Sequence, residues 1–358
     1  MTTVLIAAGG TGGHVFPALA VARALRAEGV EVAWIGTERG LEARVVPAAG
    51  FSVDWIAIQG LRRGSARDLI GLPARLLAAL WQTYRIFRRR RPDVVLALGG
   101  FVAGPGGIAA WLTRTPLVVH EQNALAGLTN RYLALVADRV LCGFPDAFRS
   151  LPGAVHTGNP VRAEIQNVAH PEIRLKGRAP PLRVLVVGGS QGASILNTVL
   201  PQAVALIDPA YRPVVHHQTG DRGLSATGEA YAARGIDARV TAFVEDMAAE
   251  YAWADVVVCR AGAMTIAELC AVGIAAVLVP FPHATDDHQT ANARFLVDRE
   301  AALCVPQAEF SPSHVAELLE GFARSPEVGV RMAERSRAFA MPDATERIVA
   351  ACLEAAHA

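Results

Sequence analysis

Three glycine-rich segments carry the clearest chemical signal in the chain: residues 9–14 (GGTGGH), 99–107 (GGFVAGPGG) and 188–192 (GGSQG). Each follows an apolar run of strand composition and precedes a stretch of helical composition. Glycine lets the backbone approach an anion closely, and the N-terminus of a following helix supplies N–H groups and partial positive charge. One such loop is most simply a tight strand-to-helix turn. Three of them at expected strand ends favour the binding of phosphate groups.

The kind of phosphate ligand is narrowed by what the sequence lacks. It contains no GxxxxGK[ST] motif, and Lys176 is its only lysine, which excludes a P-loop nucleoside triphosphatase. The first loop also departs from the dinucleotide fingerprint GxGxxG, because Val15 occupies the position of the last glycine. A dinucleotide-dependent dehydrogenase is therefore disfavoured but stays an alternative. Whether NAD or UDP raises the melting temperature of the protein would distinguish a dehydrogenase from a UDP-binding protein.

His14 closes the first loop, at the start of a helix expected over about residues 15–28. The helix dipole disfavours an imidazolium at this end, so a neutral imidazole there could accept a proton. His14 is thus a candidate general base. A histidine that hydrogen-bonds its own loop explains the position equally well.

A second candidate ligand site lies in residues 260–268 (RAGAMTIAE), which run from a strand into a helix. The helix N-terminus could hold a diphosphate, and Glu268, about one turn into the helix, could accept hydrogen bonds from ribose hydroxyls. The alternative for Glu268 is a first-turn acid that favours the helix dipole. Residues 283–289 (HATDDHQ) resemble a metal site in composition, but their acids and His288 precede a helix and are expected to cap it. No metal site is therefore predicted.

The elements that position these residues follow one pattern. Short β-branched runs alternate with Ala-, Leu- and Arg-rich stretches along the chain, which predicts parallel sheets covered by helices on both faces. Residues 183–193 repeat the strand, glycine loop and helix of residues 4–14, and residues 255–268 similarly repeat residues 93–107.

This repeat predicts an α/β fold with two Rossmann-like, doubly wound domains facing a central cleft. We expect an N-terminal domain in residues 1–160, a C-terminal domain in residues 161–342, and a last helix in residues 343–358 that packs back on the N-terminal domain. Ligands of open α/β sheets bind at the carboxyl ends of the strands, where the glycine loops are expected.

Composition excludes several classes of protein. The 358 residues are 52% hydrophobic and 19% charged, unlike a disordered chain, and a net charge of +1 gives no overall field for nucleic acid. Five scattered cysteines without CxxC spacing fit a reducing compartment. The N-terminus lacks the basic region of a secretory signal, and apolar runs are too short to span a bilayer, so a cytoplasmic protein is expected.

The charge is nevertheless unevenly distributed. Residues 62–91 contain nine arginines and one acid, Asp68, together with leucines and aromatic residues at helical spacing. Such a helix could lie on an anionic membrane surface, or it could be an ordinary amphipathic helix whose apolar stripe faces the core. We expect most of the stripe to be core and a subset to reach the membrane, with the contacts Ile70, Leu77, Trp81, Arg88, Arg89 and Trp111.

Taken in order, the motifs resemble those of a known family. The segments GGTGGHVFPALAVA, LGGFVAGPGG, HEQNALAGLTN, TGNPVR, VVGGSQGA, YAWADVVVCRAGAMTIAEL and PHATDDHQTANA are similar to the motif series of the MurG family. This family comprises bacterial peptidoglycan N-acetylglucosaminyltransferases of the GT-B fold. The resemblance covers nearly the whole chain.

The resemblance implies an inverting transfer of N-acetylglucosamine from UDP-N-acetylglucosamine to the muramoyl 4-hydroxyl of the undecaprenyl-diphosphate-linked MurNAc-pentapeptide, lipid I, which gives lipid II. It implies no cofactor and no nucleic acid. It places the enzyme peripherally on the cytoplasmic face of the bacterial inner membrane, where other cell-wall synthesis proteins are possible partners. The acceptor would bind the N-terminal domain and the UDP-sugar the C-terminal domain.

The resemblance also implies roles for individual residues. His14 matches the proposed general base, and the acceptor diphosphate would meet Gly10, Gly13, Gly100 and Gly104. The donor-binding residues would be Thr11, Gly12, Gly13, Asn123, Arg162, Ser190, Val244, Ala263, Met264, Thr265, Glu268 and Gln289.

Two further alternatives stay open. A nonhydrolysing UDP-N-acetylglucosamine 2-epimerase would share the fold but would need acids deep in the cleft that the sequence does not identify. A non-catalytic nucleotide-sugar or membrane-adaptor module would keep the glycine loops but would have no need of His14.

Overall fold

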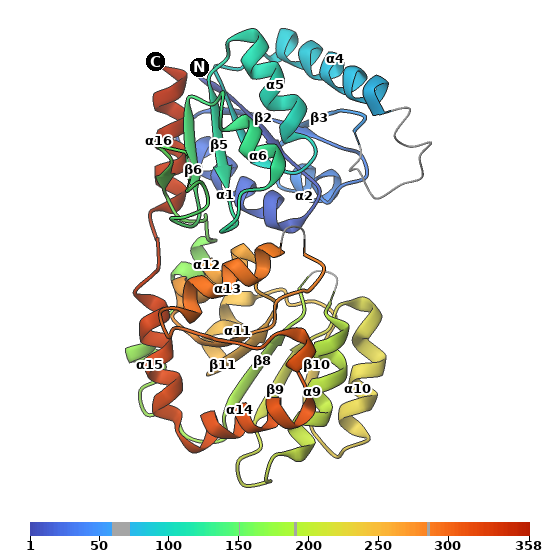
Figure 1. Ribbon diagram of the computed structural model, residues 1–358, viewed down its shortest axis with the longest axis vertical. Helices are drawn as coiled ribbons and strands as arrows, with labels where there is room; N and C mark the ends of the chain where they lie inside the picture. The colour runs from blue at the N-terminus through green and yellow to red at the C-terminus, as the bar shows by residue number, and fades with distance from the viewer. Residues whose placement is uncertain (59–71, 150, 190–191, 285–286) are drawn as a thin grey trace. The chain divides into compact units, whose positions relative to one another are not determined.

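The structure is a computed structural model that describes residues 1–58, 72–149, 151–189, 192–284 and 287–358. The chain divides into two compact units. The first combines Met1–Pro160 with Asp343–Ala358, and the second is Val161–Pro342 (Figure 1).

The described part of the first unit holds a seven-stranded parallel sheet in the order β3-β2-β1-β4-β5-β6-β7. Its strands are β1 (Thr3–Ala8), β2 (Glu31–Gly36), β3 (Ser52–Trp55), β4 (Val94–Gly99), β5 (Leu117–Glu121), β6 (Arg139–Cys142) and β7 (Val155–His156). Its helices are α1 (Gly12–Ala27), α2 (Glu42–Ala48), α4 (Leu72–Arg90), α5 (Ala103–Thr113), α6 (Leu128–Leu133) and α16 (Ala344–Ala356).

The central strands of this sheet are buried on both faces, as a parallel sheet between helix layers requires. Alternate residues of β1 face different cores: Val4 and Ile6 pack with α1 and α16, whereas Leu5 packs with α4 and α5. Ile348 and Cys352 of α16 are completely buried in the first of these cores. The last helix of the chain is therefore an integral part of the first unit (Figure 1).

The described part of the second unit holds a six-stranded parallel sheet in the order β10-β9-β8-β11-β12-β13. Its strands are β8 (Arg183–Val187), β9 (Val214–Gln218), β10 (Ala238–Thr241), β11 (Val256–Cys259), β12 (Ala275–Leu278) and β13 (Leu303–Cys304). Its helices are α7 (Ala163–Gln166), α8 (Pro171–Arg174), α9 (Ser194–Leu206), α10 (Leu224–Ala232), α11 (Met247–Trp253), α12 (Ala263–Val272), α13 (His288–Val297), α14 (Pro312–Arg324) and α15 (Pro326–Arg337).

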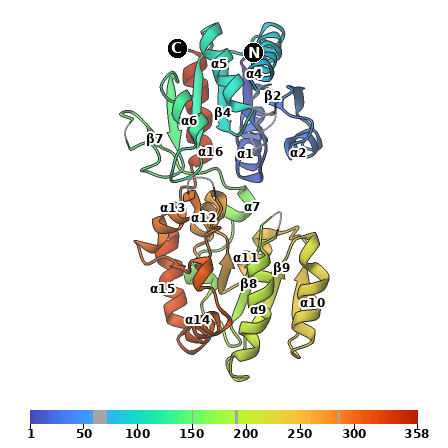
Figure 2. The ribbon, with the colours of Figure 1, turned by 45° about the vertical axis from the view of Figure 1, so that its right-hand side comes forward.

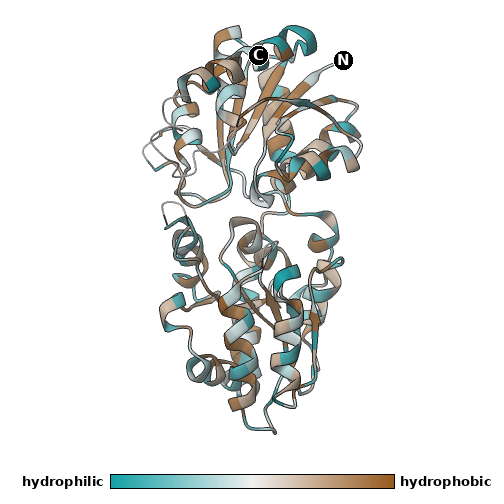
Figure 3. Cartoon of the chain, turned by 90° about the vertical axis from the view of Figure 1, so that its right-hand side faces the viewer, coloured by the Kyte–Doolittle hydropathy of each residue, from teal (hydrophilic) through white to brown (hydrophobic). Residues whose placement is uncertain are grey.

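Helices cover this second sheet as well. On one face α9 contacts both α10 and α14 (Figure 2). The apolar side chains of the strands lie between the helix layers, and the hydropathy colouring shows the strands as brown ribbons inside both units (Figure 3). The predicted α/β class with two doubly wound parallel sheets is confirmed.

Both sheets reverse their strand order at an equivalent place. In the first unit the chain moves outward from β1 to β3 and then returns to β4 on the other side of β1. In the second unit the chain likewise moves outward from β8 to β10 and then returns to β11 on the other side of β8. Such a switch point opens a crevice at the carboxyl ends of the two central strands, and ligands of doubly wound sheets bind there.

Candidate functional site

The glycine loops lie at the two switch points. The loop of residues 9–11 joins β1 to α1, and residues 100–102 join β4 to α5. In the second unit residues 260–262 join β11 to α12. The loop after β8 contains Ser190, which lies outside the described residues.

The first two loops contact each other through their backbones. Gly100 has φ +76°, and a Cβ atom there would lie 2.1 Å from the carbonyl oxygen of Gly9. Only glycine fits such a contact. The starts of α1 and α5 are thereby brought to one edge of the sheet, where their first N–H groups have no intrahelical acceptor. Gly13 is in the first turn of α1 and Gly104 in the first turn of α5.

Helix α1 begins earlier than the sequence predicted. Thr11 has extended backbone angles (φ −109°, ψ 162°) and serves as N-cap, so Gly12, Gly13 and His14 belong to the first turn. The two glycines are poor helix formers, which is why the sequence pattern placed the start near Val15.

A buried acid that the sequence analysis missed holds the first loop. Glu42, the first residue of α2, is completely buried, and its Oε2 accepts a hydrogen bond of 2.9 Å from the Gly10 N–H. Its Oε1 accepts from the N–H and the hydroxyl of Thr37, at 3.0 and 2.8 Å. The Gly10 N–H is therefore used inside the protein, so an acceptor diphosphate would take its hydrogen bonds from other donors of the loop.

His14 is partly exposed in the first turn of α1. Its Nδ1 lies 3.3 Å from the Thr11 hydroxyl, so the hydrogen bond of the histidine to its own loop is present. This contact orients the ring rather than excluding a role as base. The opposite edge of the ring, with Nε2, lies against Gly99 at the end of β4, where a Cβ atom would be 3.0 Å from Nε2.

The end of β5 carries a dense polar network. Glu121 is 2% exposed, and its carboxylate accepts from the N–H and side-chain amide of Asn123, at 2.9 and 3.1 Å. It also accepts from the Gly127 N–H at 3.1 Å and from the Asn130 amide at 2.9 Å. Asn123, a predicted donor-binding residue, is thus fixed by Glu121.

His120, next to this carboxylate, does not titrate near neutral pH. Burial lowers its pKa to about 4, and its Nε2 contacts the Gly158 carbonyl oxygen at 3.0 Å. His120 is therefore a neutral structural group.

In the second unit, α12 begins at Ala263 with Gly262 as an extended N-cap. The predicted residues Ala263, Met264 and Thr265 therefore form its first turn. Glu268 is the sixth residue of the helix, about one and a half turns from its start, so it lies close to the expected position, and the alternative of a first-turn acid is wrong.

Glu268 joins two other side chains. The Tyr251 hydroxyl donates to its Oε2 at 2.9 Å, and the Arg162 guanidinium lies 3.4 Å from its Oε1. Burial raises the pKa of Glu268, while Arg162 and the Tyr251 hydrogen bond act in the opposite direction. Arg162 and Glu268, both predicted to bind the donor, are thus direct neighbours.

The remaining predicted donor residues lie on two other segments. Gln289 is in the first turn of α13, where its side-chain oxygen accepts from the Phe281 N–H at 2.9 Å. Val244 lies in the segment between β10 and α11. Among the described residues, no cluster of three or more His, Cys, Asp or Glu side chains could hold a metal ion. At the start of α13, the Asp287 carboxylate instead accepts a hydrogen bond from the Thr290 hydroxyl.

The basic helix α4 contacts α5. Leu77 and Trp81 on α4 are 67% and 59% exposed, and Trp111 on α5 is 58% exposed. Ile70 lies outside the described residues. The first two turns of α4 contribute less to the core than expected, because Leu76 is also exposed, whereas Ile86 and Phe87 are buried.

The arginines of α4 differ in their surroundings. Arg89 and Arg90 form ion pairs with the buried Asp54 of β3, so Arg89 is in part a structural cation. Arg88 is exposed, and Arg85 lies over the Trp81 ring at 4.8 Å from its centroid. Among the described helices, none is long and apolar enough to cross a bilayer.

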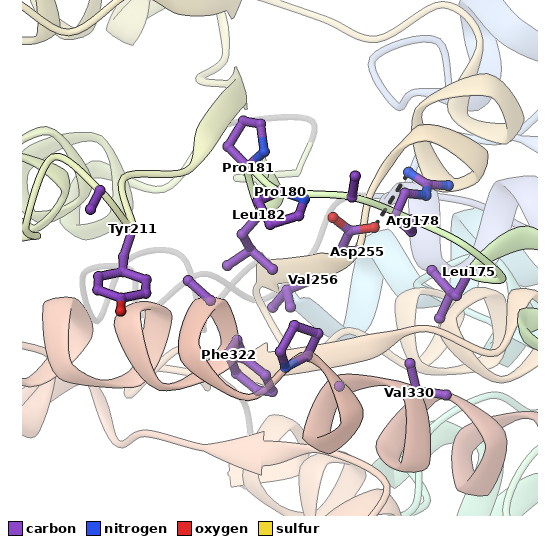
Figure 4. A pocket seen from close by; sticks show the side chains of 15 residues that line it. Leu175, Arg178, Pro180, Pro181, Leu182, Tyr211, Asp255, Val256, Phe322 and Val330 are labelled. Carbon is purple, nitrogen blue, oxygen red and sulfur yellow. Dashed lines mark ion pairs between the residues drawn. The ribbon is translucent and has the colours of Figure 1, made fainter.

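A pocket of about 160 Å³ lies elsewhere in the second unit (Figure 4). Leu182, just before β8, and Val256, at the start of β11, line it, together with Tyr211 and Phe322. It therefore lies at the amino ends of the strands, at the edge opposite to the glycine loops.

Comparison with known proteins agrees with this geometry. Residues 4–142 match the glycosyltransferase family 28 N-terminal domain, and residues 183–348 match the C-terminal domain of the same family. A relative from Marinobacter nauticus is 52% identical over 353 residues, which is 99% of this chain and 97% of the relative. It is named UDP-N-acetylglucosamine–N-acetylmuramyl-(pentapeptide) pyrophosphoryl-undecaprenol N-acetylglucosamine transferase.

Solved structures show the same fold. The crystal structure of Acinetobacter baumannii MurG matches with a TM-score of 0.86 and 38% identity, over 99% of this chain and all of that one. A UDP-GlcNAc 2-epimerase from Neisseria meningitidis, bound to UDP-GlcNAc, matches with a TM-score of 0.67 but only 12% identity, over 99% of this chain and 100% of that one. The second likeness concerns the fold alone.

Proposed function

Because the chain belongs to glycosyltransferase family 28, we propose that it transfers N-acetylglucosamine from UDP-N-acetylglucosamine to the undecaprenyl-diphosphate-linked N-acetylmuramyl-pentapeptide. The structural observation that carries the proposal is the pairing of the α12 N-terminus with the partly exposed carboxylate of Glu268 at the switch point of the second sheet. Helix N–H groups suit a diphosphate, and a carboxylate suits ribose hydroxyls, so a nucleoside diphosphate fits this arrangement.

The donor would bind the second unit in the following way. The first N–H groups of α12, at Ala263, Met264 and Thr265, would meet the diphosphate, and Glu268 would accept from the ribose. As UDP leaves, the helix N-terminus and Arg162 would stabilise the developing negative charge. Gln289 would hydrogen-bond the sugar and fix its pose; Asn123, in the first unit, is also assigned to the donor.

The acceptor would bind the first unit. The starts of α1 and α5, with Gly13, Gly100 and Gly104, would receive the diphosphate that links the sugar to the lipid. His14 would remove the proton of the muramoyl 4-hydroxyl as it attacks the anomeric carbon in line, which inverts the configuration. A base whose pKa is close to the working pH contributes typically ~10²–10⁴-fold to the rate.

A lipid-linked acceptor also requires contact with a membrane. We propose that the exposed side chains Leu77, Trp81 and Trp111, with the cations Arg85 and Arg88, bring the protein peripherally to an anionic surface on the cytoplasmic side. Apolar anchors beside cations are the usual composition of an interfacial site.

One incubation tests the reaction. Purified protein is mixed with labelled UDP-N-acetylglucosamine and a short-chain analogue of the lipid-linked acceptor, and the products are separated. We expect the lipid-linked disaccharide and an equal amount of UDP, and only with the acceptor present. Epimerised UDP-sugar without the acceptor, or the absence of a disaccharide, would contradict the proposal.

A further inference from the structure

Tyr251 contacts the donor-site carboxylate from the interior of the protein. It lies on α11 and is 0% exposed, among the largest fully buried side chains of the described residues. Its hydroxyl donates to Oε2 of Glu268 at 2.9 Å. A buried phenol needs a partner for its hydroxyl, and the partner here is a carboxylate.

The two partners of Glu268 differ in how firmly they are held. Arg162, 3.4 Å from Oε1, has a side chain that is 43% exposed. Tyr251 is enclosed, and the helix that carries it is fixed at both ends. The Asp246 carboxylate caps α11 by accepting from the Ala249 N–H at 2.9 Å, and Arg178 donates to the carbonyl oxygens of Ala252 and Trp253 at the other end.

We infer that Tyr251 is a positioning residue for the donor nucleotide, because its hydroxyl fixes the Glu268 carboxylate in the orientation that accepts the ribose hydroxyls. The inference rests on the donor site proposed above and deepens it. A carboxylate oxygen has two lone pairs, so the hydrogen bond from Tyr251 leaves acceptor capacity on both oxygens. The phenol stays out of contact with the nucleotide and acts through Glu268.

The substitution Tyr251→Phe removes the hydroxyl and keeps the ring. We expect it to raise the dissociation constant of UDP-N-acetylglucosamine by about three- to ten-fold, less than the loss of a direct hydrogen bond to a charged group would cause, because the phenol acts only through Glu268. Titration calorimetry without acceptor measures this directly. In the transfer assay the donor KM should rise by the same factor while kcat changes little.

The pH dependence of binding separates positioning from a packing defect. Donor binding requires the ionised Glu268, so affinity is lost as the pH falls through its pKa. The Tyr251 hydrogen bond lowers that pKa, and its loss raises it, so the acid limb of the affinity profile should shift to higher pH in Tyr251→Phe. UDP-N-acetylglucosamine suits the measurement because its diphosphate is a diester and stays ionised over the pH range in which a carboxyl group titrates. The ligand itself therefore adds no titration to the affinity profile.

The other groups near Glu268 do not produce this shift. Within the described residues the ionisable groups that interact with it are Tyr251 of α11, Arg162 before α7 and Cys259 at the end of β11. Burial raises the pKa of Cys259 to about 12, and the pKa of Tyr251 is also raised well above its ordinary value, so both stay neutral. A guanidinium group keeps its charge in proteins.

The matched control is Tyr231→Phe. Tyr231 is also buried in the second unit, but its hydroxyl lies 3.1 Å from Nδ1 of His217 rather than near a proposed donor residue. The substitution Tyr231→Phe removes the same hydroxyl group from a comparable buried environment. It should leave the donor affinity and the pH profile of that affinity as in the wild type. Thermal unfolding of both variants reports any shared loss of stability.

A double-mutant cycle with Glu268→Gln completes the test. In the Glu268→Gln background, Tyr251→Phe should cause no further loss of affinity. If Glu268→Gln leaves the affinity for UDP-N-acetylglucosamine unchanged, the proposed donor site is wrong. If Glu268→Gln weakens binding but Tyr251→Phe matches the wild type, or if the two losses add in full, the donor site stands and the role of Tyr251 is wrong.

Discussion

At the scale of single residues, three hydrogen bonds from residues outside the ligand contacts hold the proposed sites in place. Glu42 holds the Gly10 N–H, Glu121 holds Asn123, and Glu268 is held by Tyr251. Each lies at or near the carboxyl edge of a sheet. An electrostatic site is effective when its donors are already oriented before the ligand arrives. We conclude that buried polar groups, the carboxylates of Glu42 and Glu121 in the first unit and the Tyr251 hydroxyl in the second, supply this preorganisation.

Glu42→Gln tests this conclusion in the first unit. The amide of glutamine presents N–H groups on one side, so it cannot accept from both Gly10 and Thr37 as the carboxylate does. We expect a loss of about 1–3 kcal/mol in the free energy of unfolding and a higher KM for the lipid-linked acceptor. Calorimetric affinity for UDP-N-acetylglucosamine should change little.

The exposed Glu38 provides the matched control for that substitution. Glu38→Gln makes the same chemical change four residues earlier, without a buried network, and should behave as the wild type. An acceptor KM that is unchanged in Glu42→Gln would show that Glu42 has only a local structural role.

His14→Ala tests the proposed base. The ring is oriented by Thr11 and faces the second glycine loop, and its removal takes away the only group assigned to proton removal. We expect kcat to fall by about 10²-fold or more, while the affinity for UDP-N-acetylglucosamine changes far less. Single-turnover rates with saturating substrates measure the chemical step. A kcat equal to that of the wild type would exclude His14 as the base.

At the scale of elements, α4 and α5 contact each other and bear the exposed side chains Leu77, Trp81 and Trp111 together with exposed cations of α4. Binding to vesicles with anionic lipids should weaken as salt rises, because the Debye length shrinks from about 10 Å at 0.1 M to about 3 Å at 1 M. Each cation near such a surface contributes roughly 1 kcal/mol. Arg85→Glu with Arg88→Glu should therefore abolish most vesicle binding in a sedimentation assay.

The choice of these two arginines follows from the structure, because reversing Arg89 or Arg90 would also break the ion pairs with Asp54. Arg23→Glu with Arg44→Glu is the control, since both residues are exposed on α1 and α2, outside the α4 and α5 layer. Binding that resists salt, or an equal loss in the control, would contradict an electrostatic contribution from α4.

At the scale of the whole molecule, the fold class could be predicted because its signals are local. Strands buried on both faces, such as β1 and β4, read as continuous apolar runs, and each is followed by a glycine loop. The contacts of Glu42 and Tyr251 could not be predicted, because they join residues that are far apart in the sequence. Position 42 carries no local motif, and only the packing of α2 brings its carboxylate to Gly10.

The last helix makes a related point about the whole chain, because the first unit is discontinuous in sequence. Ile348, Val349 and Cys352 of α16 are buried in the core formed with α1 and the sheet, and a buried aliphatic side chain contributes about 1.5–3 kcal/mol. A chain truncated after Pro342 should therefore lose hydrogen-exchange protection in residues 1–160 and keep most of it in residues 161–342.

Mass spectrometry of peptides after exchange measures the two units separately. Truncation after Ala356, which keeps α16, is the control and should leave both units protected. Equal loss in both units, or in neither, would show that α16 is not the element that completes the first core.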